Sequence, residues 1–159
     1  VIMDMYRRYV QPKKITLATI DPSLPDAIIL DMDGTACLFG DKNPYERDFE
    51  NDIPNYPVIK TIVALSKQFK VIVCSGRSNK VREVTAAWLN KYNISHEALH
   101  MRKEGDFRKD TIVKSEMYAQ HIEGKYNIFA VFDDRPSVLD MWESKGLFTF
   151  NVNQGRIDF

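Results

Sequence analysis

The sequence is poor in cysteine and has no long apolar run. Only two cysteines, Cys37 and Cys74, occur among 159 residues; they form no CxxC pair, and no signal-like apolar stretch opens the chain. This pattern indicates reduced thiols and a cytoplasmic protein. No apolar run is long enough to span a membrane, so we expect no membrane partner.

A net charge, internal repeats and a Gly-rich nucleotide-binding loop are also absent. Lys plus Arg number 22 and Asp plus Glu number 22, so any contact with nucleic acid depends on a local basic patch rather than on the overall charge. The chain has no GxxxxGK[ST] sequence, which excludes a P-loop kinase. A length of 159 residues fits one main domain.

Prolines separate the first residues from the rest of the chain. Residues 3–10 have the pattern of a short amphipathic helix, and residues 11–26 contain three prolines, which is typical of a linker. We therefore divide the chain into an N-terminal helix and linker over residues 1–26 and a domain over residues 27–159.

Apolar runs and helical patterns alternate along this domain. Strands are expected at residues 27–30, 70–75 and 127–132, with weaker ones at 97–101 and 147–152. Helices are expected at residues 56–69, 78–92, 110–122 and 136–145. The alternation predicts an α/β fold, Rossmann-like, with three αβα layers and a mostly parallel sheet of about five strands.

Polar residues follow the three strongest strands, where parallel sheets place their ligand sites. These segments are Asp31-Met32-Asp33-Gly34-Thr35, Ser75-Gly76-Arg77 and Asp133-Asp134-Arg135. Carboxylates gathered at one point repel one another and resist burial, so a bound cation is needed to offset the cost. Oxygen ligands of this kind suit Mg²⁺, and the candidate metal ligands are Asp31, Asp33, Asp133 and Asp134.

The same segments contain groups suited to phosphoryl transfer. Asp31 lies at the very end of its strand and can attack phosphorus, while Asp33 can protonate the leaving oxygen and later deprotonate water. The turn at Gly34 and Thr35 exposes amides that can receive phosphate oxygens. The candidate phosphate ligands are therefore Thr35, Ser75, Gly76 and Arg77, with Ser75 and Gly76 placed before a helix that we expect to begin near Ser78.

Cations must balance the carboxylates during the reaction. The segment RKDTIVK, residues 108–114, offers Arg108, Lys109 and Lys114, and spacing does not choose among them. Arg135 is expected to pair with an aspartate, and Cys74, Trp88 and Trp142 are expected in the core.

The order of these motifs resembles the haloacid dehalogenase superfamily of Mg²⁺-dependent phosphotransferases over residues 27–152. More narrowly, four segments resemble the 3′-phosphatase domain of phage polynucleotide kinase-phosphatases. They are PY at 44–45, SGR at 75–77, GDFRKDTIVK at 105–114 and DDRPSVLDMWESKG at 133–146.

This resemblance implies a role for each matching residue. Asp31 would be the nucleophile and Asp33 the general acid/base, while Ser75, Gly76 and Arg77 would bind phosphate. Lys114 would contact the phosphoryl group and the nucleophile. The metal would be held by the carboxylates of Asp31, Asp133 and Asp134 and the backbone carbonyl of Asp33.

The implied activity is removal of a 3′-phosphate from DNA or RNA ends through an aspartyl-phosphate. Residues 36–56 leave room for a minimal cap only, which fits a polymer end. Possible polynucleotide contacts are Lys42, which departs from the arginine of the phage enzyme, Tyr45, Arg108 and Lys109. A kinase domain or partner would precede the chain, in the host cytoplasm if a phage encodes it.

Two other functions compete with this one. The same chemistry can act on a mononucleotide or another small phosphorylated metabolite, although the missing large cap argues against it. A binding module that kept the fold and lost turnover can also recognise a phosphorylated end, although the intact catalytic set in the sequence opposes it.

Overall fold

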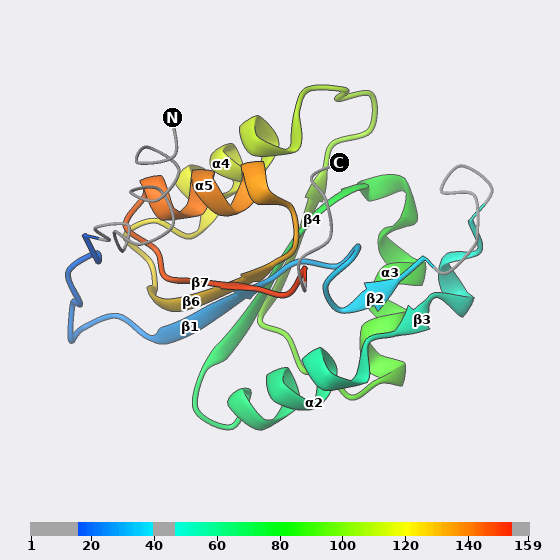
Figure 1. Cartoon of the computed structure of the whole chain (residues 1–159), viewed down its shortest axis with the longest axis horizontal. Coiled ribbons are helices and arrows are strands. Elements are labelled where there is room, and N and C mark those ends of the chain that lie inside the picture. The colour runs from blue at the N-terminus through cyan, green and yellow to red at the C-terminus, as the bar shows by residue number, and fades with distance from the viewer. Residues whose placement is uncertain (1–15, 40–46, 154–159) are drawn as a thin grey trace, which may run out of the picture.

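A parallel five-stranded sheet forms the centre of the molecule (Figure 1). The computed structural model describes residues 16–39 and 47–153, so the helix expected at residues 3–10 lies outside the described residues. The strands are β1 (Asp26–Leu30), β4 (Lys70–Ser78), β5 (Ala98–Arg102), β6 (Asn127–Asp133) and β7 (Thr149–Asn151). Their order is β5-β4-β1-β6-β7, and every neighbouring pair is parallel.

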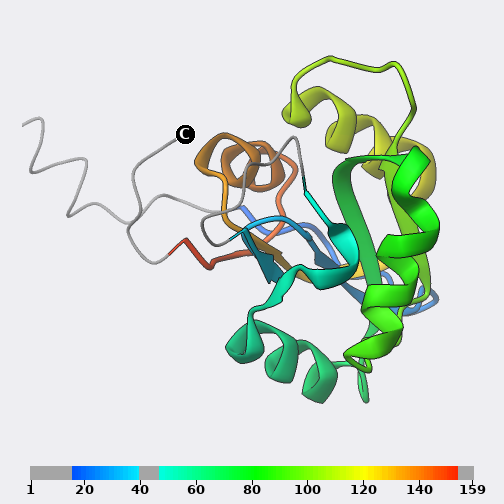
Figure 2. The same cartoon turned by 90° about the vertical axis from the view of Figure 1, so that its right-hand side faces the viewer.

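Helices cover both faces of this sheet, as Figure 2 shows. On one face, α2 (Tyr56–Leu65) and α3 (Arg82–Lys91) pack over a core that includes Trp88. On the other face, α4 (Asp110–His121) and α5 (Pro136–Ser144) pack over a core that includes Trp142 and Cys74. The predicted three-layer α/β fold is confirmed, and no helix in the described ranges is long and apolar enough to cross a membrane.

The alternation of side chains along β1 explains why the sheet has two cores. Ile28 and Leu30 point into the core under α2 and α3, whereas Ala27 and Ile29 point into the core under α4 and α5. All four are almost fully buried. A continuous apolar run is therefore what this central strand requires.

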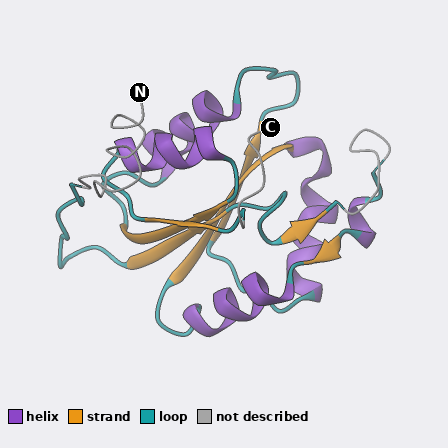
Figure 3. Ribbon diagram, viewed as in Figure 1, coloured by secondary structure: helices purple, strands orange, loops and turns teal. Residues whose placement is uncertain are grey.

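A small antiparallel pair lies apart from the main sheet, as Figure 3 shows. It consists of β2 (Cys37–Leu38) and β3 (Ile53–Pro54), with the short 3₁₀ helix η1 (Phe49–Asn51) beside β3. Strands of two residues have no periodic pattern, so the sequence did not predict them. This small insertion agrees with the expectation of a minimal cap.

The strand predicted at residues 70–75, which is β4, differs from its predicted form. β4 continues to Ser78 instead of ending at Ser75, and its pairing with β5 shifts register between these two residues, so Gly76 and Arg77 form a bulge. α3 begins only at Arg82, after the 3₁₀ turn η2 (Asn79–Val81). The helix expected to begin near Ser78 thus starts as this 3₁₀ turn, which Ser78 caps, while Ser75 and Gly76 lie within β4 and are separated from the N-terminus of α3 by the rest of the strand and the turn.

The other helix boundaries are close to those predicted. α2 is shorter than the expected 56–69, because the chain turns at Ser66 and the amides of Gln68 and Phe69 donate to the carbonyl of Leu65. The remaining helices end within one residue of the predicted ends.

Two histidines stack where β5 meets the end of α4. The centroids of the His100 and His121 rings are 4.6 Å apart, and the two ring planes are nearly parallel, at 6°. Burial, followed by the charges of His121, Arg82 and Lys125, lowers the pKa of His100 to about 4. In the unfolded chain this pKa returns to about 6.5.

This lowered pKa makes folding stability depend on pH. Between about pH 6.5 and pH 4 the unfolded chain binds a proton at His100 that the folded chain does not, so stability is lost as the pH falls through that window. Because other groups also titrate there, the test compares urea unfolding of the wild type with His100→Gln. We expect a shallower loss of stability on acidification in the variant; equal pH slopes would contradict this account.

Candidate active site

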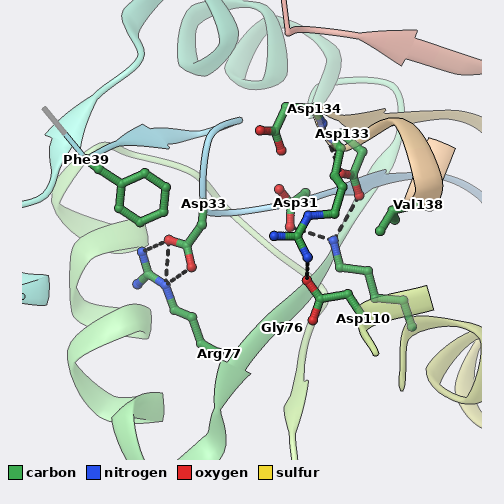
Figure 4. Close-up of a pocket in the computed structure, with 11 residues that line it drawn as sticks. Asp31, Asp33, Phe39, Gly76, Arg77, Asp110, Asp133, Asp134 and Val138 are labelled. Carbon is green, nitrogen blue, oxygen red and sulfur yellow. Dashed lines mark hydrogen bonds and ion pairs between the residues drawn. The ribbon is translucent and has the colours of Figure 1, made fainter. Parts of the chain in front are cut away.

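The carboxyl ends of β1, β4 and β6 surround a cavity of about 190 Å³ (Figure 4). Its position is the one expected for ligand sites in parallel sheets, next to the point where the strand order reverses. The lining residues are Asp31, Asp33, Phe39, Gly76, Arg77, Asp110, Lys114, Asp133, Asp134, Arg135 and Val138.

A tight loop after β1 places its two aspartates. The amide of Asp31 still donates to Phe132 of β6 at 3.0 Å, which continues the sheet pairing by one residue. The chain then turns at Gly34, where φ is +83° and a Cβ atom would overlap the carboxylate of Asp134. Glycine is therefore required here both by the backbone conformation and by the approach of β6. The turn separates Asp31 from Asp33, and the two carboxylates meet different partners.

Asp31 belongs to a buried acidic cluster with Asp133 and Asp134, whose carboxylate oxygens lie within 4.8 Å of one another. Lys114 of α4 donates to Oδ1 of Asp31 at 2.7 Å and to Oδ2 of Asp133 at 2.9 Å. The hydroxyl of Thr35 donates to Oδ2 of Asp31 at 3.0 Å. Asp133 also accepts from the amides of Asp134 and Arg135 and from the indole N–H of Trp142, so the one cation among these donors to the cluster is the ammonium of Lys114.

The electrostatics of this cluster leave negative charge in excess. Burial and the charge of Asp133 raise the pKa of Asp31 well above its usual value, and the same two causes raise the pKa of Asp134. Burial opposes the charged form of Lys114, but Asp133 and Asp31 outweigh it and raise its pKa. Three carboxylates against one ammonium leave two negative charges, and all the donors are oxygens, so the cluster fits a hard divalent cation.

Asp33 faces a different set of partners, on the cap side of the cavity. Nε and Nη2 of Arg77 donate to its carboxylate at 3.0 and 2.7 Å, and Nη2 of Arg47 donates at 2.6 Å. Burial acts to raise the pKa of Asp33, but the hydrogen bonds and charges of Arg77 and Arg47 outweigh it, so the pKa lies below its usual value. Asp33 is therefore ionised and fixed in orientation before any ligand binds.

Asp52, which follows η1, binds the same two arginines as Asp33. It is buried, and it accepts hydrogen bonds from Arg47 at 2.7 and 2.5 Å and from Arg77 at 2.7 Å. The ring of Phe49 lies 4.7 Å and 4.8 Å from the two guanidinium carbons. Asp33, Cys37 and Asp52 also lie close enough to share an ion, but the guanidinium groups already bind both carboxylates.

Asp110, the first residue of α4, forms the opposite wall. Its carboxylate pairs with Arg102 through Oδ1 and with Arg135 through Oδ2, the latter at 2.8 Å. A Cβ atom on Gly76 would lie 2.7 Å from Oδ1 of Asp110, so glycine allows this close approach. The expectation that Arg135 pairs with an aspartate is confirmed.

Most of the predicted catalytic, metal-binding and phosphate-binding residues line the cavity, and two lie behind its surface. Asp31, Asp33, Asp133, Asp134, Lys114, Gly76 and Arg77 line the cavity. Thr35 and Ser75 lie behind its surface, because the Thr35 hydroxyl faces Asp31 and the Ser75 hydroxyl accepts the amide of Arg77 at 3.1 Å. Among the three cations that spacing left open, Lys114 is the one at the carboxylates.

The predicted polynucleotide contacts lie elsewhere. Arg108 and Lys109 precede α4 outside the cavity lining, and the guanidinium of Arg108 binds Asp106 and Glu116. Lys42 and Tyr45 lie outside the described residues. Sequence reasoning missed Arg47, Asp52 and Asp110, since single charged residues next to short loops carry no pattern that distinguishes them from surface residues.

Comparison with known proteins now identifies the family. A model described as the phosphatase domain of polynucleotide kinase PNKP matches residues 25–159. The chain belongs to the family of PNKP phosphatase domains. This domain is therefore a phosphatase, that is, a phosphoric monoester hydrolase, as the sequence resemblance implied.

Individual relatives agree with the family match. The chain is 35% identical over 148 residues to a protein of Autographa californica nuclear polyhedrosis virus described as a "putative bifunctional polynucleotide kinase/RNA ligase", and the match covers 88% of the chain and 21% of that protein. It is 39% identical to a chain of the Pnkp1/Rnl/Hen1 RNA repair complex, with a TM-score of 0.84, covering 90% of this chain and 47% of that one. The viral relative is a baculovirus protein rather than a phage one.

A more distant structure shows the breadth of the fold. The D,D-heptose 1,7-bisphosphate phosphatase of B. bronchiseptica has 15% identity and a TM-score of 0.57, and the match covers 79% of each chain. At this identity the likeness shows a shared fold alone. The chain spans about half or less of the length of the two nearer relatives described above.

Asp52 provides a test of the arginine network. In Asp52→Asn one carboxylate charge is lost beside two buried guanidiniums, so we expect the free energy of unfolding to fall by about 3 kcal/mol. Urea denaturation measures this loss. The matched control is Glu97→Gln, which removes a carboxylate from an exposed pair with Lys70 and should cost less than about 1 kcal/mol. Equal losses in the two variants would argue against a buried network.

Proposed function

We propose that this domain is a Mg²⁺-dependent polynucleotide 3′-phosphatase that prepares nucleic acid ends for repair. The observation that carries the proposal is the bridge from Lys114 to Asp31 and Asp133, inside an acidic cluster at the floor of an open cavity. This bridge orients one carboxylate as a nucleophile and leaves the cluster with the charge that a divalent cation offsets.

In the first step, Asp31 attacks the phosphorus atom of the terminal phosphate. Its carboxylate forms the new P–O bond as the bond to the ribose or deoxyribose 3′-oxygen breaks, which yields an aspartyl-phosphate. Lys114, already hydrogen-bonded to Asp31, balances charge on the phosphoryl oxygens. Asp33 gives a proton to the leaving 3′-oxygen. The negative charge of the arriving phosphate opposes the effect of Arg77 and Arg47, which favours the protonated form of Asp33 that this step needs.

In the second step, water hydrolyses the aspartyl-phosphate. Asp33 now takes a proton from the attacking water, and phosphate leaves with Asp31 restored. The ionised form that Arg77 and Arg47 favour is the form suited to this role. Their hydrogen bonds also fix the carboxylate on the leaving-group side of the cavity.

The bound metal would be held by Asp31, Asp133, Asp134 and the backbone carbonyl of Asp33. When bound, Mg²⁺ supplies positive charge to the phosphoryl oxygens and screens the carboxylates from one another. The phosphate is further received by the backbone at Gly76, whereas the turn amides of Gly34 and Thr35 already donate to the carbonyls of Cys37 and Met32 at 2.8 and 3.2 Å. Arg77 serves mainly to orient Asp33, and Ser75 supports the amide of Arg77.

A polymer end rather than a small metabolite is the proposed substrate. In the described residues between β1 and α2, the cap consists of the short pair β2–β3 and the turn η1, and the nearer relatives are a polynucleotide kinase/RNA ligase and a component of an RNA repair complex. Lys42, Tyr45 and Lys109 are proposed to contact the polynucleotide. We also propose that the domain acts beside a kinase domain joined through residues 1–26, as a partner in end repair.

The decisive measurement is phosphate release from matched DNA and RNA oligonucleotides phosphorylated at the 3′ or the 5′ end, alongside a free 3′-mononucleotide. We expect the 3′-phosphorylated oligonucleotide to be preferred by at least about tenfold in kcat/KM, and Asp31→Asn to abolish release from every substrate. Equal or better activity on the mononucleotide would instead support a small-molecule phosphatase. Persistence of activity in Asp31→Asn would exclude the aspartyl-phosphate.

Metal removal gives an independent test. EDTA should abolish phosphate release. Added Mg²⁺ at a tenfold excess over its Kd should raise the free energy of unfolding by about 1.4 kcal/mol, and the melting temperature should rise with it. Asp134→Asn is expected to be at least as stable as the wild type without Mg²⁺, because one buried repulsion is removed, and to gain less from Mg²⁺. An equal Mg²⁺-dependent rise in the variant would place the ion elsewhere.

A further inference from the structure

The loop between β5 and α4, residues 103–109, stands out from the body of the molecule in Figures 1 and 2. It carries Phe107, which at 95% exposure is the most exposed large apolar side chain in the described ranges. Exposure of a single apolar residue is common and has no meaning by itself. The exposure of Phe107 is informative because the backbone on both sides of the ring is held by hydrogen bonds.

A single guanidinium fixes the backbone on both sides of Phe107. Nη1 of Arg102 donates to the carbonyl of Asp106 at 3.1 Å and to the carbonyl of Arg108 at 2.6 Å. A turn closed by the amide of Asp106 on the carbonyl of Lys103, at 3.0 Å, precedes the ring. The phenyl ring is therefore exposed on a hydrogen-bonded segment of chain, which lowers the entropic cost of binding through it.

The same guanidinium reaches the wall of the cavity. Nε of Arg102 donates to the carbonyl of Gly76 at 2.8 Å, and Nη2 pairs with Asp110. Both of these partners line the cavity. Phe107 is three residues before Asp110, a distance that a chain spans in at most about 11 Å. The Cα atom of Phe107 therefore lies within about 11 Å of that of Asp110, and Arg102 ties the backbone on both sides of Phe107 to this wall of the cavity.

The surroundings of the ring favour a nucleic acid base over a protein surface. The other residues of the loop are charged, apart from one glycine, so the ring is not part of an apolar patch within the loop. Arg108 is held by Asp106 and Glu116, which leaves the aromatic face as the notable binding feature. An aromatic face stacks on any base, and the exposed Lys109 next to Arg108 suits the backbone of the same strand.

We propose that Phe107 forms a base-stacking subsite for the 3′-terminal region of the bound polynucleotide, held in register with the phosphate site by Arg102. This inference rests on the proposed 3′-phosphatase function and deepens it. It explains how a domain with so small a cap distinguishes a nucleotide end from other phosphate monoesters. The subsite is tolerant of base identity, because stacking uses no hydrogen-bond pattern.

The test compares Phe107→Ala and Phe107→Trp on two 3′-phosphorylated oligonucleotides, one with normal nucleotides and one whose 3′-terminal nucleotides lack bases. On the normal substrate, Phe107→Ala should lower kcat/KM by about 5- to 150-fold, the ratio that corresponds to the loss of one stacked base. On the abasic substrate, the variant and the wild type should be equal. Phe107→Trp should keep the base-dependent rate.

Phe148→Ala is the matched control. It removes another exposed phenyl ring, 41% accessible, just before β7 and at the opposite edge of the sheet from β5, and it should leave both rates unchanged. An unchanged rate in Phe107→Ala, or an equal loss on both substrates, would overturn the subsite while leaving the 3′-phosphatase proposal intact. A wild type inactive on every 3′-phosphorylated oligonucleotide would overturn the proposed function itself.

Discussion

The ammonium of Lys114 is the contact on which the arrangement of the site depends. It joins the ends of β1 and β6 by binding Asp31 and Asp133 at once, and it comes from α4, which packs on one face of the sheet. Without a cation, three carboxylates within 4.8 Å of one another would be driven apart or neutralised by protonation. The ammonium alone does not balance the three carboxylates, so the cluster keeps the excess negative charge that suits a divalent cation.

The cavity therefore has two sides with different charge balance. On the side of Asp31, carboxylates outnumber cations, and burial raises the pKa values of Asp31 and Asp134. On the side of Asp33, two arginines match Asp33 and Asp52, and the pKa of Asp33 falls. Two aspartates that are only two residues apart thus have opposite pKa shifts: Asp31 needs a further cation to be stabilised as a carboxylate, whereas two arginines already hold Asp33 in its ionised form.

The sequence allowed prediction of the features that depend on local pattern. The apolar run of β1 followed by Asp31 and Asp33 is a short-range signal, and the alternation of such runs with helical patterns is enough to predict a parallel sheet and the convergence of its strand ends. Arg47 and Asp52 were missed because their importance lies in contacts with residues far along the chain. The β4 bulge was missed because hydrogen bonding to β5, and not residue type alone, continues the strand past Ser75.

The β4 bulge lies in the part of the domain that holds Asp33, whereas the β5–α4 loop lies outside it. Gly76 and Arg77 form the bulge of an internal strand that pairs with β5 on either side of them, at Ser75 and Ser78, and the guanidinium of Arg77 is held in place by Asp33 and Asp52. The β5–α4 loop, in contrast, begins where the sheet ends, so its exposed side chains can change without altering Asp31 or Asp33, although an insertion would break the hydrogen bonds from Arg102 to the carbonyls of Asp106 and Arg108. In this architecture substrate preference and bond-breaking chemistry can evolve independently.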